Sequence, residues 1–172
     1  MNFKKLLIGL VAVVVMMNAS FTGVNAAPAS EGAKSGVIAG STYTKSDLRY
    51  MASIIYCEAG NQCYAGKLAV GIVVMNRVES KAFPNTIKGV IYQPYQFTPA
   101  RTGALSSAMS TYNKTGFKSN AAYKQCLKAA KEALSGSKSV TLKGKSKSLK
   151  GYYFFSRYVA GCRLVIGAHQ FK

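Results

Sequence analysis

Residues 65–78 constrain the fold more than any other segment, because they predict a helix that is apolar over most of its circumference. Its apolar residues occupy more than one helical face: Leu68, Ala69, Ile72, Val73 and Met75. A helix without a broad polar face has to be surrounded by protein. We therefore predict that this segment is the central, buried helix of the domain, with Asn76 and Arg77 as polar residues near its end.

Two further segments have apolar residues at helical spacing. The first begins at Ser46-Asp47, either of which can cap a helix, and ends at Gly60-Asn61. The second spans about residues 120–134, with its lysines facing water. The two predicted inner faces consist of Leu48, Met51, Ala52 and Ile55 in the first segment and Tyr123, Cys126, Leu127, Ala130 and Leu134 in the second. Between the central helix and the second segment, residues 84–118 carry prolines, glycines and aromatics and predict a loop.

The C-terminal quarter of the chain favours β-structure. Residues 137–150 read as a basic connector, and residues 151–158 and 162–166 read as two strands joined by a turn at Ala160-Gly161. Helices followed by a small antiparallel β-hairpin or sheet near the C-terminus define an α+β fold. Residues 45–172 are one domain's worth of chain and contain no internal repeat.

Residues 1–26 have the pattern of a secretory signal peptide. Lys4 and Lys5 precede an apolar run at 6–17 that is too short to span a bilayer comfortably, and small residues stand at 24–26. Residues 27–44, rich in Ala, Ser and Gly, predict a flexible leader. An uncleaved N-terminal anchor is the alternative. Cleavage would give a secreted protein without a membrane span.

The charge balance is strongly basic, with 23 Lys plus Arg against 5 Asp plus Glu and a net charge of +18. Such a surface attracts polyanions, among which nucleic acid, anionic lipid and anionic wall polymers all fit. Export argues against nucleic acid and favours the cell envelope. The alternative is that the charge serves solubility alone.

The four cysteines permit either two disulfides or buried thiols: Cys57, Cys63, Cys126 and Cys162. Five residues separate the first two, which is not a usual zinc spacing, and the chain has one histidine, so we expect no metal and no cofactor. A thiol–imidazole pair of Cys57 or Cys162 with His169 is a possible amidase site. Because adjacent helical residues point about 100° apart, we do not expect Cys57 and Glu58 to line one cleft.

Glu58 is the acid that helical spacing projects from an apolar face, three residues after Ile55. Burial raises the pKa of a carboxyl group and makes it a proton donor near neutral pH, as glycoside cleavage requires. The alternative is a structural carboxylate paired with Arg77 or a lysine. Of the other acids, Glu31 falls in the leader and Asp47 at a helix start. Glu132 is predicted on a solvent-exposed helix face, and Glu79 remains a candidate for a second catalytic carboxylate.

A lone acid favours lytic transglycosylase chemistry over a two-carboxylate glycosidase, because the C6 hydroxyl of muramic acid can act as the nucleophile. Aromatic residues at 92–117 and 152–155 can stack on sugar rings or pack in the core. Among them Tyr92, Tyr95 and Phe97 are the candidates for a cleft wall.

Several short motifs occur together in a specific order: Glu58-Ala59, Gly66, Ala69-Val70, Asn76-Arg77, Phe83-Pro84, Gln96-Phe97, "GYYFF" and "GAHQF". In this order, over residues 45–172, the chain resembles the catalytic domain of SleB/CwlJ-type cell wall hydrolases, the spore cortex-lytic enzymes. The resemblance implies a lysozyme- or transglycosylase-like α+β domain that cleaves the glycan strands of peptidoglycan, including spore cortex.

The resemblance also implies site residues. It places the catalytic acid at Glu58 and puts Gln96 and Phe97 near the cleft. It also implies that Asn76, Arg77 and His169 support the walls of the cleft. Many members carry a second glutamate where this chain has Gln62, so a non-catalytic cationic wall-binding protein is the alternative function. We expect a monomer whose partner is peptidoglycan, with anionic wall polymers as further candidates.

Overall fold

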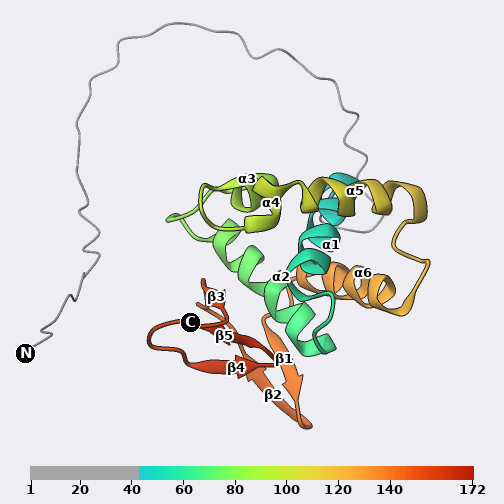
Figure 1. Ribbon diagram of the computed structural model, residues 1–172. Coiled ribbons are helices and arrows are strands. Elements are labelled where there is room, and N and C mark those ends of the chain that lie inside the picture. Colours follow the sequence, from blue (N-terminus) through green and yellow to red (C-terminus); the bar gives the residue numbers. More distant parts are fainter. Residues whose placement is uncertain (1–42) are drawn as a thin grey trace, which may run out of the picture. The chain divides into compact units, whose positions relative to one another are not determined.

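The computed structural model describes residues 43–172, which form six helices followed by five short strands (Figure 1). The helices are α1 (Lys45–Ala59), α2 (Tyr64–Glu79), α3 (Ile87–Tyr92), α4 (Thr98–Thr102), α5 (Ala104–Thr115) and α6 (Ala121–Leu134). The strands are β1 (Ser139–Leu142), β2 (Lys145–Ser148), β3 (Phe155–Ser156), β4 (Leu164–Ile166) and β5 (His169–Phe171). The signal peptide and most of the leader predicted from the sequence lie outside the described residues. Within residues 43–172, no helix has the length and apolar character needed to cross a membrane.

Helix α2 is the central helix, as its composition predicts. Twelve of its 16 residues are buried, and α1, α3, α6 and β1 contact it. Gly71 makes the close packing possible, because a Cβ there would come 2.8 Å from the Cβ of Ala133 on α6 and 3.1 Å from the Cδ1 of Ile55 on α1. Three long helices therefore share one core.

Helix α1 begins with a capping box, and its N-cap is Thr44 rather than Ser46 or Asp47. The Thr44 hydroxyl accepts a hydrogen bond from the backbone N–H of Asp47 at 3.0 Å, and the Asp47 carboxylate accepts one from the backbone N–H of Thr44 at 3.0 Å. The two side chains satisfy each other's backbone amides. Asp47 does serve the helix start, but from its third position.

The loop predicted at 84–118 is wrong, because α3, α4 and α5 lie within it. Pro94 lies in the turn between α3 and α4, and three other residues that suggested a loop stand at helix ends. Pro99 is in the first turn of α4, and Gly103 and Gly116, with φ of 81° and 59°, end α4 and α5. The three helices lie together beside α1 (Figure 1).

The basic connector predicted at 137–150 is also wrong, because β1 and β2 form an antiparallel hairpin there. Its two turn residues, Lys143 and Gly144, have φ of 48° and 73°, as a two-residue hairpin turn with the right twist requires. The sequence does not indicate this hairpin because lysine, which is frequent in it, has low strand propensity.

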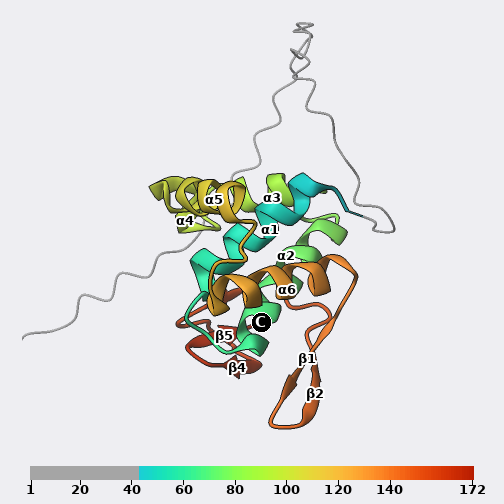
Figure 2. The ribbon, with the colours of Figure 1, turned by 90° about the vertical axis from the view of Figure 1, so that its right-hand side faces the viewer.

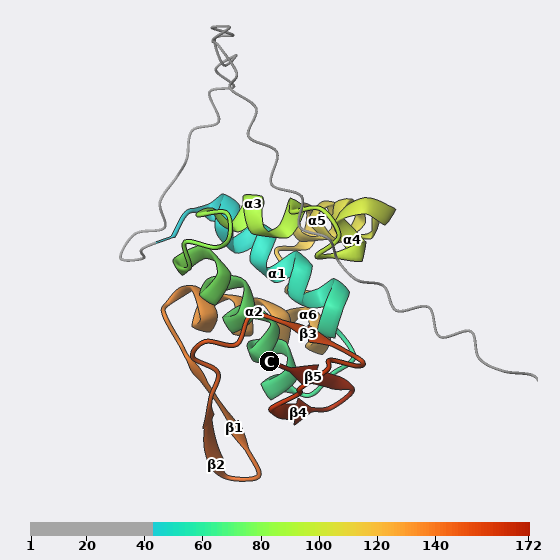
Figure 3. The ribbon, with the colours of Figure 1, turned by 90° about the vertical axis from the view of Figure 1, so that its left-hand side faces the viewer.

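The last three strands form one antiparallel sheet of order β3-β5-β4. The C-terminal strand β5 lies in the middle, so the segments at 151–158 and 162–166 pair with β5 rather than with each other. The α+β class with small antiparallel sheets near the C-terminus is confirmed. Figure 2 and Figure 3 show the sheet beside the N-terminal half of α2.

Candidate active site

A cavity of about 1150 Å³ opens where the C-terminal end of α1, the loop after it, α5, β3 and the turn before β5 meet. Six of the residues predicted for the site line this cavity: Glu58, Gln62, Arg77, Tyr95, Gln96 and His169. They come from segments up to 111 positions apart in the chain, from Glu58 to His169.

Glu58 lies in the last turn of α1 and is half-buried. Burial raises the pKa of its carboxyl group. The partial negative charge at a helix C-terminus acts in the same direction, and the last turn of α1 contains no basic residue. Glu58 makes no hydrogen bond or ion pair within residues 43–172, so it is not the structural partner of Arg77 or of a lysine there. The site thus holds an unneutralised carboxyl group that favours its protonated form.

Arg77 brings a positive charge to the cavity from the end of α2. The residue is 3% exposed, and its Nε donates a hydrogen bond to the Tyr153 carbonyl at 2.7 Å. Its guanidinium lies 5.3–5.4 Å from the ring centres of Phe83, Phe97 and Phe154, and its Nη1 is buried without a hydrogen-bond partner. Burial lowers the pKa of Arg77 to about 10, so the group stays charged at neutral pH.

Gln62 fastens the loop after α1 to the turn between β4 and β5. Its Oε1 accepts a hydrogen bond from the Ala168 backbone N–H at 3.0 Å, and its Nε2 donates one to the Asn61 side chain at 3.0 Å. The buried Lys67 ammonium donates to the Gln62 carbonyl. A Cβ at Gly167 would collide with Gln62 Oε1, so the turn needs glycine both for this approach and for its φ of 58°.

His169 follows that turn and is 9% exposed. Its ring centre lies 5.3 Å from that of Phe155 and 6.2 Å from that of Phe171, and its Nδ1 is buried without a partner. Burial, and secondarily the charge of Arg157, lower the pKa of His169. The imidazole is therefore neutral at neutral pH and serves as part of the cavity wall.

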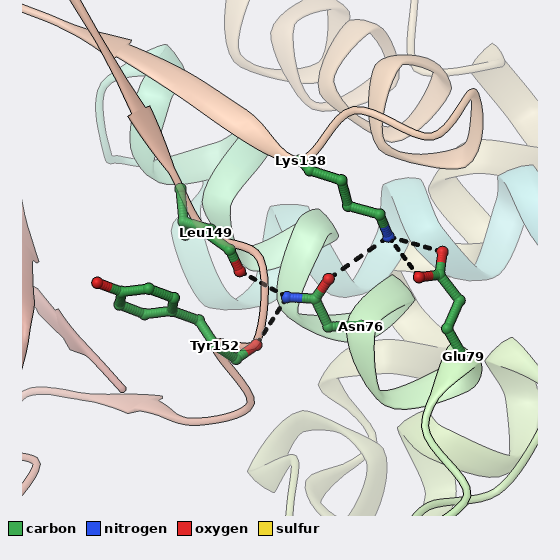
Figure 4. A network of polar contacts seen from close by, with 5 residues as sticks. All are labelled: Asn76, Glu79, Lys138, Leu149 and Tyr152. Atoms are coloured by element: carbon green, nitrogen blue, oxygen red, sulfur yellow. Dashed lines mark hydrogen bonds and ion pairs between the residues drawn. The ribbon is translucent and has the colours of Figure 1, made fainter.

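Three other residues predicted for the site lie outside the lining of this cavity. Tyr92 is 44% exposed and packs edge-on against Tyr50, at the part of α1 farther from Glu58. Phe97 is 2% exposed and packs against Arg77 and Phe155 without lining the cavity itself. Asn76 is 6% exposed and donates hydrogen bonds to backbone carbonyls outside the cavity (Figure 4).

The sequence did not predict that α5 and α6 line part of this cavity. Ala104, Ser107, Ala108 and Thr111 line the cavity from α5, and Ala122 and Tyr123 line it from α6. The α5 residues recur at three- and four-residue spacing, which is the helical signal that the loop prediction overlooked. Arg157, near β3, is a further lining residue that the sequence did not single out, and the exposed Phe154 lines the cavity from the predicted aromatic segment 152–155.

The four cysteines are all free thiols. Cys57 lines the same cavity as Glu58, contrary to expectation, because the cavity wraps around the end of α1. Burial, with a smaller effect from Glu58, raises the pKa of Cys57 to about 11, which disfavours a nucleophilic thiolate. Cys162 instead donates to the Leu164 carbonyl at 3.3 Å. Neither thiol has a hydrogen bond to His169 in the described part of the chain.

Glu79 is the other acid considered for catalysis, and it lies away from the Glu58 cavity. Its carboxylate pairs with the Lys138 ammonium at 2.6 Å, and both side chains are partly exposed (Figure 4). Glu58 is the one carboxylate among the described residues that line the large cavity. Residues 43–172 contain no group of three or more His, Cys, Asp or Glu arranged to hold a metal ion.

Residues 61–171 match the family described as Cell Wall Hydrolase. A spore cortex-lytic enzyme of Bacillus cereus is 41% identical over 63 residues, which are 37% of this chain and 24% of that enzyme. The spore cortex-lytic enzyme of Bacillus subtilis is 36% identical over 63 residues, 37% of this chain and 21% of that enzyme. The chain thus matches about a quarter or less of the length of these curated relatives.

Two solved structures have the same fold. The catalytic domain of the germination-specific lytic transglycosylase SleB from Bacillus anthracis has a TM-score of 0.53 at 26% identity, covering 76% of this chain and 96% of that one. The catalytic domain of the Bacillus cereus SleB protein has a TM-score of 0.53 at 26% identity, covering 75% and 91%. Because the family match covers well over half of its length, the chain belongs to the cell wall hydrolase family.

Proposed function

We propose that this protein cleaves the glycan strands of peptidoglycan and that Glu58 is its proton donor. Family membership and the likeness to the SleB catalytic domains support peptidoglycan as the substrate. The observation that carries the proposal is the half-buried, unpaired Glu58 carboxyl group on the wall of a cavity of about 1150 Å³. The family match begins at residue 61, so the assignment of Glu58 depends on this geometry and on the sequence motif.

The reaction begins with proton transfer from Glu58 to the glycosidic oxygen that joins muramic acid to glucosamine. The bond from that oxygen to the anomeric carbon breaks, and the carbon develops oxocarbenium character. Burial raises the pKa of Glu58, which favours the protonated form that this step needs.

We assign the second step to the C6 hydroxyl of the same muramic acid, because no second carboxylate among the described residues lines the cavity to activate a water. The hydroxyl oxygen bonds to the anomeric carbon and closes an anhydro ring. Its proton passes to the Glu58 carboxylate, which restores the starting state. This makes the protein a lytic transglycosylase, and a muramidase would use water in place of the hydroxyl.

The remaining lining residues suit a sugar chain. Tyr95 is 85% exposed with the Arg101 guanidinium 5.5 Å from its ring centre, so it presents a broad apolar face for a pyranose ring. Gln96, Ser107 and Thr111 supply amide and hydroxyl groups that can bond acetamido and hydroxyl groups of the glycan.

Mass spectrometry of muropeptides released from purified peptidoglycan tests the proposal. We expect anhydro-muramic ends, which are lighter by one water than hydrolysed ends, and no effect of a thiol-blocking reagent. New amino groups together with thiol sensitivity would instead establish the Cys/His amidase. A failure to release any fragment from either vegetative or spore-cortex peptidoglycan would leave the non-catalytic wall-binding function. Hydrolysed ends would keep Glu58 as the donor but assign the second step to water.

A further inference from the structure

The hairpin of β1 and β2 is a concentrated cationic element that the glycan-cleaving site does not use. Its lysines lie within 13 residues that contain no acid: Lys138, Lys143, Lys145, Lys147 and Lys150. All four residues of β2 are exposed, and none of the hairpin residues lines the large cavity. In all three ribbon views the hairpin tip extends away from the helices (Figures 1, 2 and 3).

The charge of this hairpin is not neutralised by the protein. Lys138, at its base, pairs with Glu79, and that is the one ion pair among residues 43–172. The other acids of that region are engaged elsewhere or lie in the cavity: Asp47 caps α1, Glu132 accepts a hydrogen bond from Tyr64 at 2.6 Å, and Glu58 lines the large cavity. Four exposed ammonium groups thus remain for an outside partner.

The base of the hairpin is anchored to α2 (Figure 4). Asn76 Nδ2 donates hydrogen bonds to the carbonyls of Leu149 at 2.8 Å and Tyr152 at 2.9 Å. Val140 and the Leu149 side chain are buried in the core. The Leu149 N–H donates to the Lys138 carbonyl at 2.7 Å and closes the base. The lysines are therefore held on an ordered arm fixed to the catalytic domain.

The two faces of the hairpin differ in chemistry. Lys145 and Lys147 share a face, because residues two apart in a strand point the same way, about 7 Å apart. Ser146 and Ser148 point to the opposite face, where their partners across the hairpin are Thr141 and Ser139. The hairpin therefore carries exposed ammonium groups on the face that it shares with Val140 and Leu142, and hydroxyl groups on the other face.

We propose that the β1–β2 hairpin is a docking surface for an anionic wall polymer built of phosphodiester-linked repeats. Lysine binds phosphate as a compact point charge that requires no fixed bidentate geometry, and a phosphodiester chain presents such charges one after another along its length. The hairpin carries no exposed large apolar side chain to insert into a bilayer. Nor does it have an aromatic residue on which nucleic-acid bases could stack. Docking there would keep the enzyme at the wall while the separate cavity engages the glycan.

The experiment compares binding to polymer-bearing cell walls and to the same walls stripped of phosphodiesters with hydrofluoric acid. The test variant combines K143Q, K145Q, K147Q and K150Q. The matched control combines K114Q, K118Q, K124Q and K131Q, four exposed lysines at α5 and α6 and in the loop between them, so both variants lose the same charge. Co-sedimentation on ice at several salt concentrations measures binding without requiring cleavage.

We expect the hairpin variant to bind polymer-bearing walls at least about tenfold more weakly at low salt, with a smaller dependence of affinity on salt. The control should change by less than threefold, and all three proteins should bind stripped walls equally. Equal losses in the two variants would overturn the proposal in favour of diffuse charge. If the hairpin variant lost as much affinity for stripped walls, the partner of the hairpin would be peptidoglycan carboxylates instead of the polymer. Tighter binding to phosphatidylglycerol vesicles or duplex DNA than to the polymer would also overturn it.

This outcome is separable from that of the proposed function. Rates of fragment release from stripped walls should be the same for wild type, hairpin variant and control variant. Loss of docking with unchanged release supports the hairpin proposal, and absence of release from all three proteins contradicts the cleavage proposal alone.

Discussion

Three influences act on the Glu58 carboxyl group in the same direction. It is half-buried, it lies at the negative end of α1, and it has no cationic partner among the described residues. Each disfavours the carboxylate, so together they favour the protonated form of Glu58. Helical spacing from Ile55 placed Glu58 on a buried face in the sequence. That it has no partner, and that Arg77 is held among three aromatic rings instead, depends on contacts between distant segments that spacing alone does not show.

The pH dependence of kcat/KM should follow the protonation of Glu58. Because burial raises the pKa of Glu58, we expect activity to be retained above the ordinary glutamate range near 4.3 and to fall as pH rises through the raised value. With one carboxylate acting, the profile should lack an ascending limb from a second one. Initial rates of fragment release between pH 4 and 9 test this. A profile that climbs steadily across that range contradicts the acid role.

Glu58→Gln should stabilise the protein at neutral pH. The raised pKa means that the folded state pays for ionising Glu58, so wild-type stability falls as pH rises between the unfolded and folded pKa values. We expect the variant to be more stable than wild type at pH 7 and equal to it near pH 3, where the side chain is neutral in both proteins. Denaturant unfolding at the two pH values measures the difference. A variant that is less stable at pH 7 would reveal a stabilising partner of the carboxylate.

Gln62 should tolerate an acid but not truncation. Glu at this position can still accept the hydrogen bond from the Ala168 N–H. Ala cannot, so the turn before His169 would lose this hydrogen bond. We expect Gln62→Glu to keep kcat/KM within about threefold, and Gln62→Ala to lower it by roughly tenfold with a rise in KM, as one lost hydrogen bond of about 1 kcal/mol or more implies. Steady-state digestion rates for both variants are the measurement. Equal activity of Gln62→Ala and wild type would show that the turn does not need this clamp.

At the scale of elements, the helices α1, α2 and α6 were predictable, whereas the 12-residue α5 and the short α3 and α4 were not. The helices α1 and α6 each bury a periodic stripe, and α2 is buried around most of its circumference, and these patterns are long enough to be recognised in one sequence. The segments α3 and α4 have only 6 and 5 residues, so their spacing cannot establish a period. The strand β2 has no buried residue at all. Its place is set by pairing with β1 and by the turn at Lys143-Gly144 rather than by its own composition.

The contact between α2 and the hairpin provides an element-level test. Asn76→Ala would remove both hydrogen bonds and leave the Tyr152 carbonyl without its donor, whereas the Leu149 carbonyl keeps the Tyr152 N–H, and we expect a cost of about 1–3 kcal/mol. Glu79→Gln, one turn away, removes a partly exposed ion pair worth about 0–1 kcal/mol. Chemical denaturation of both variants should therefore give the larger loss for Asn76→Ala. Similar losses would mean that the hairpin base is held by the ion pair.

At the scale of the whole molecule, the fold is held by one helical core without covalent links. The four thiols are spread over α1, the loop before α2, α6 and the segment before β4, and all are free. A domain of this size can bury enough apolar surface to fold without disulfides. The sequence left the oxidation state open, because cysteine number and spacing do not determine which thiols meet in space.

Reductant should therefore leave the thermal stability unchanged. We expect the same Tm with and without dithiothreitol, measured by circular dichroism on protein purified from the growth medium. Loss of even one structural disulfide typically costs about 2–5 kcal/mol and would lower the Tm by many degrees. Such a fall would show that cysteines pair in the secreted protein.

The central claim is that one carboxyl group, Glu58, supplies the proton for glycan cleavage, and its most direct test is the rate of fragment release by Glu58→Gln on purified peptidoglycan. Glu79→Gln is the matched control, because it removes the same charge outside the cavity. The account predicts a loss of about 10²–10⁴-fold for Glu58→Gln, with a folded protein, and less than a threefold change for Glu79→Gln. Wild-type release by Glu58→Gln would contradict it.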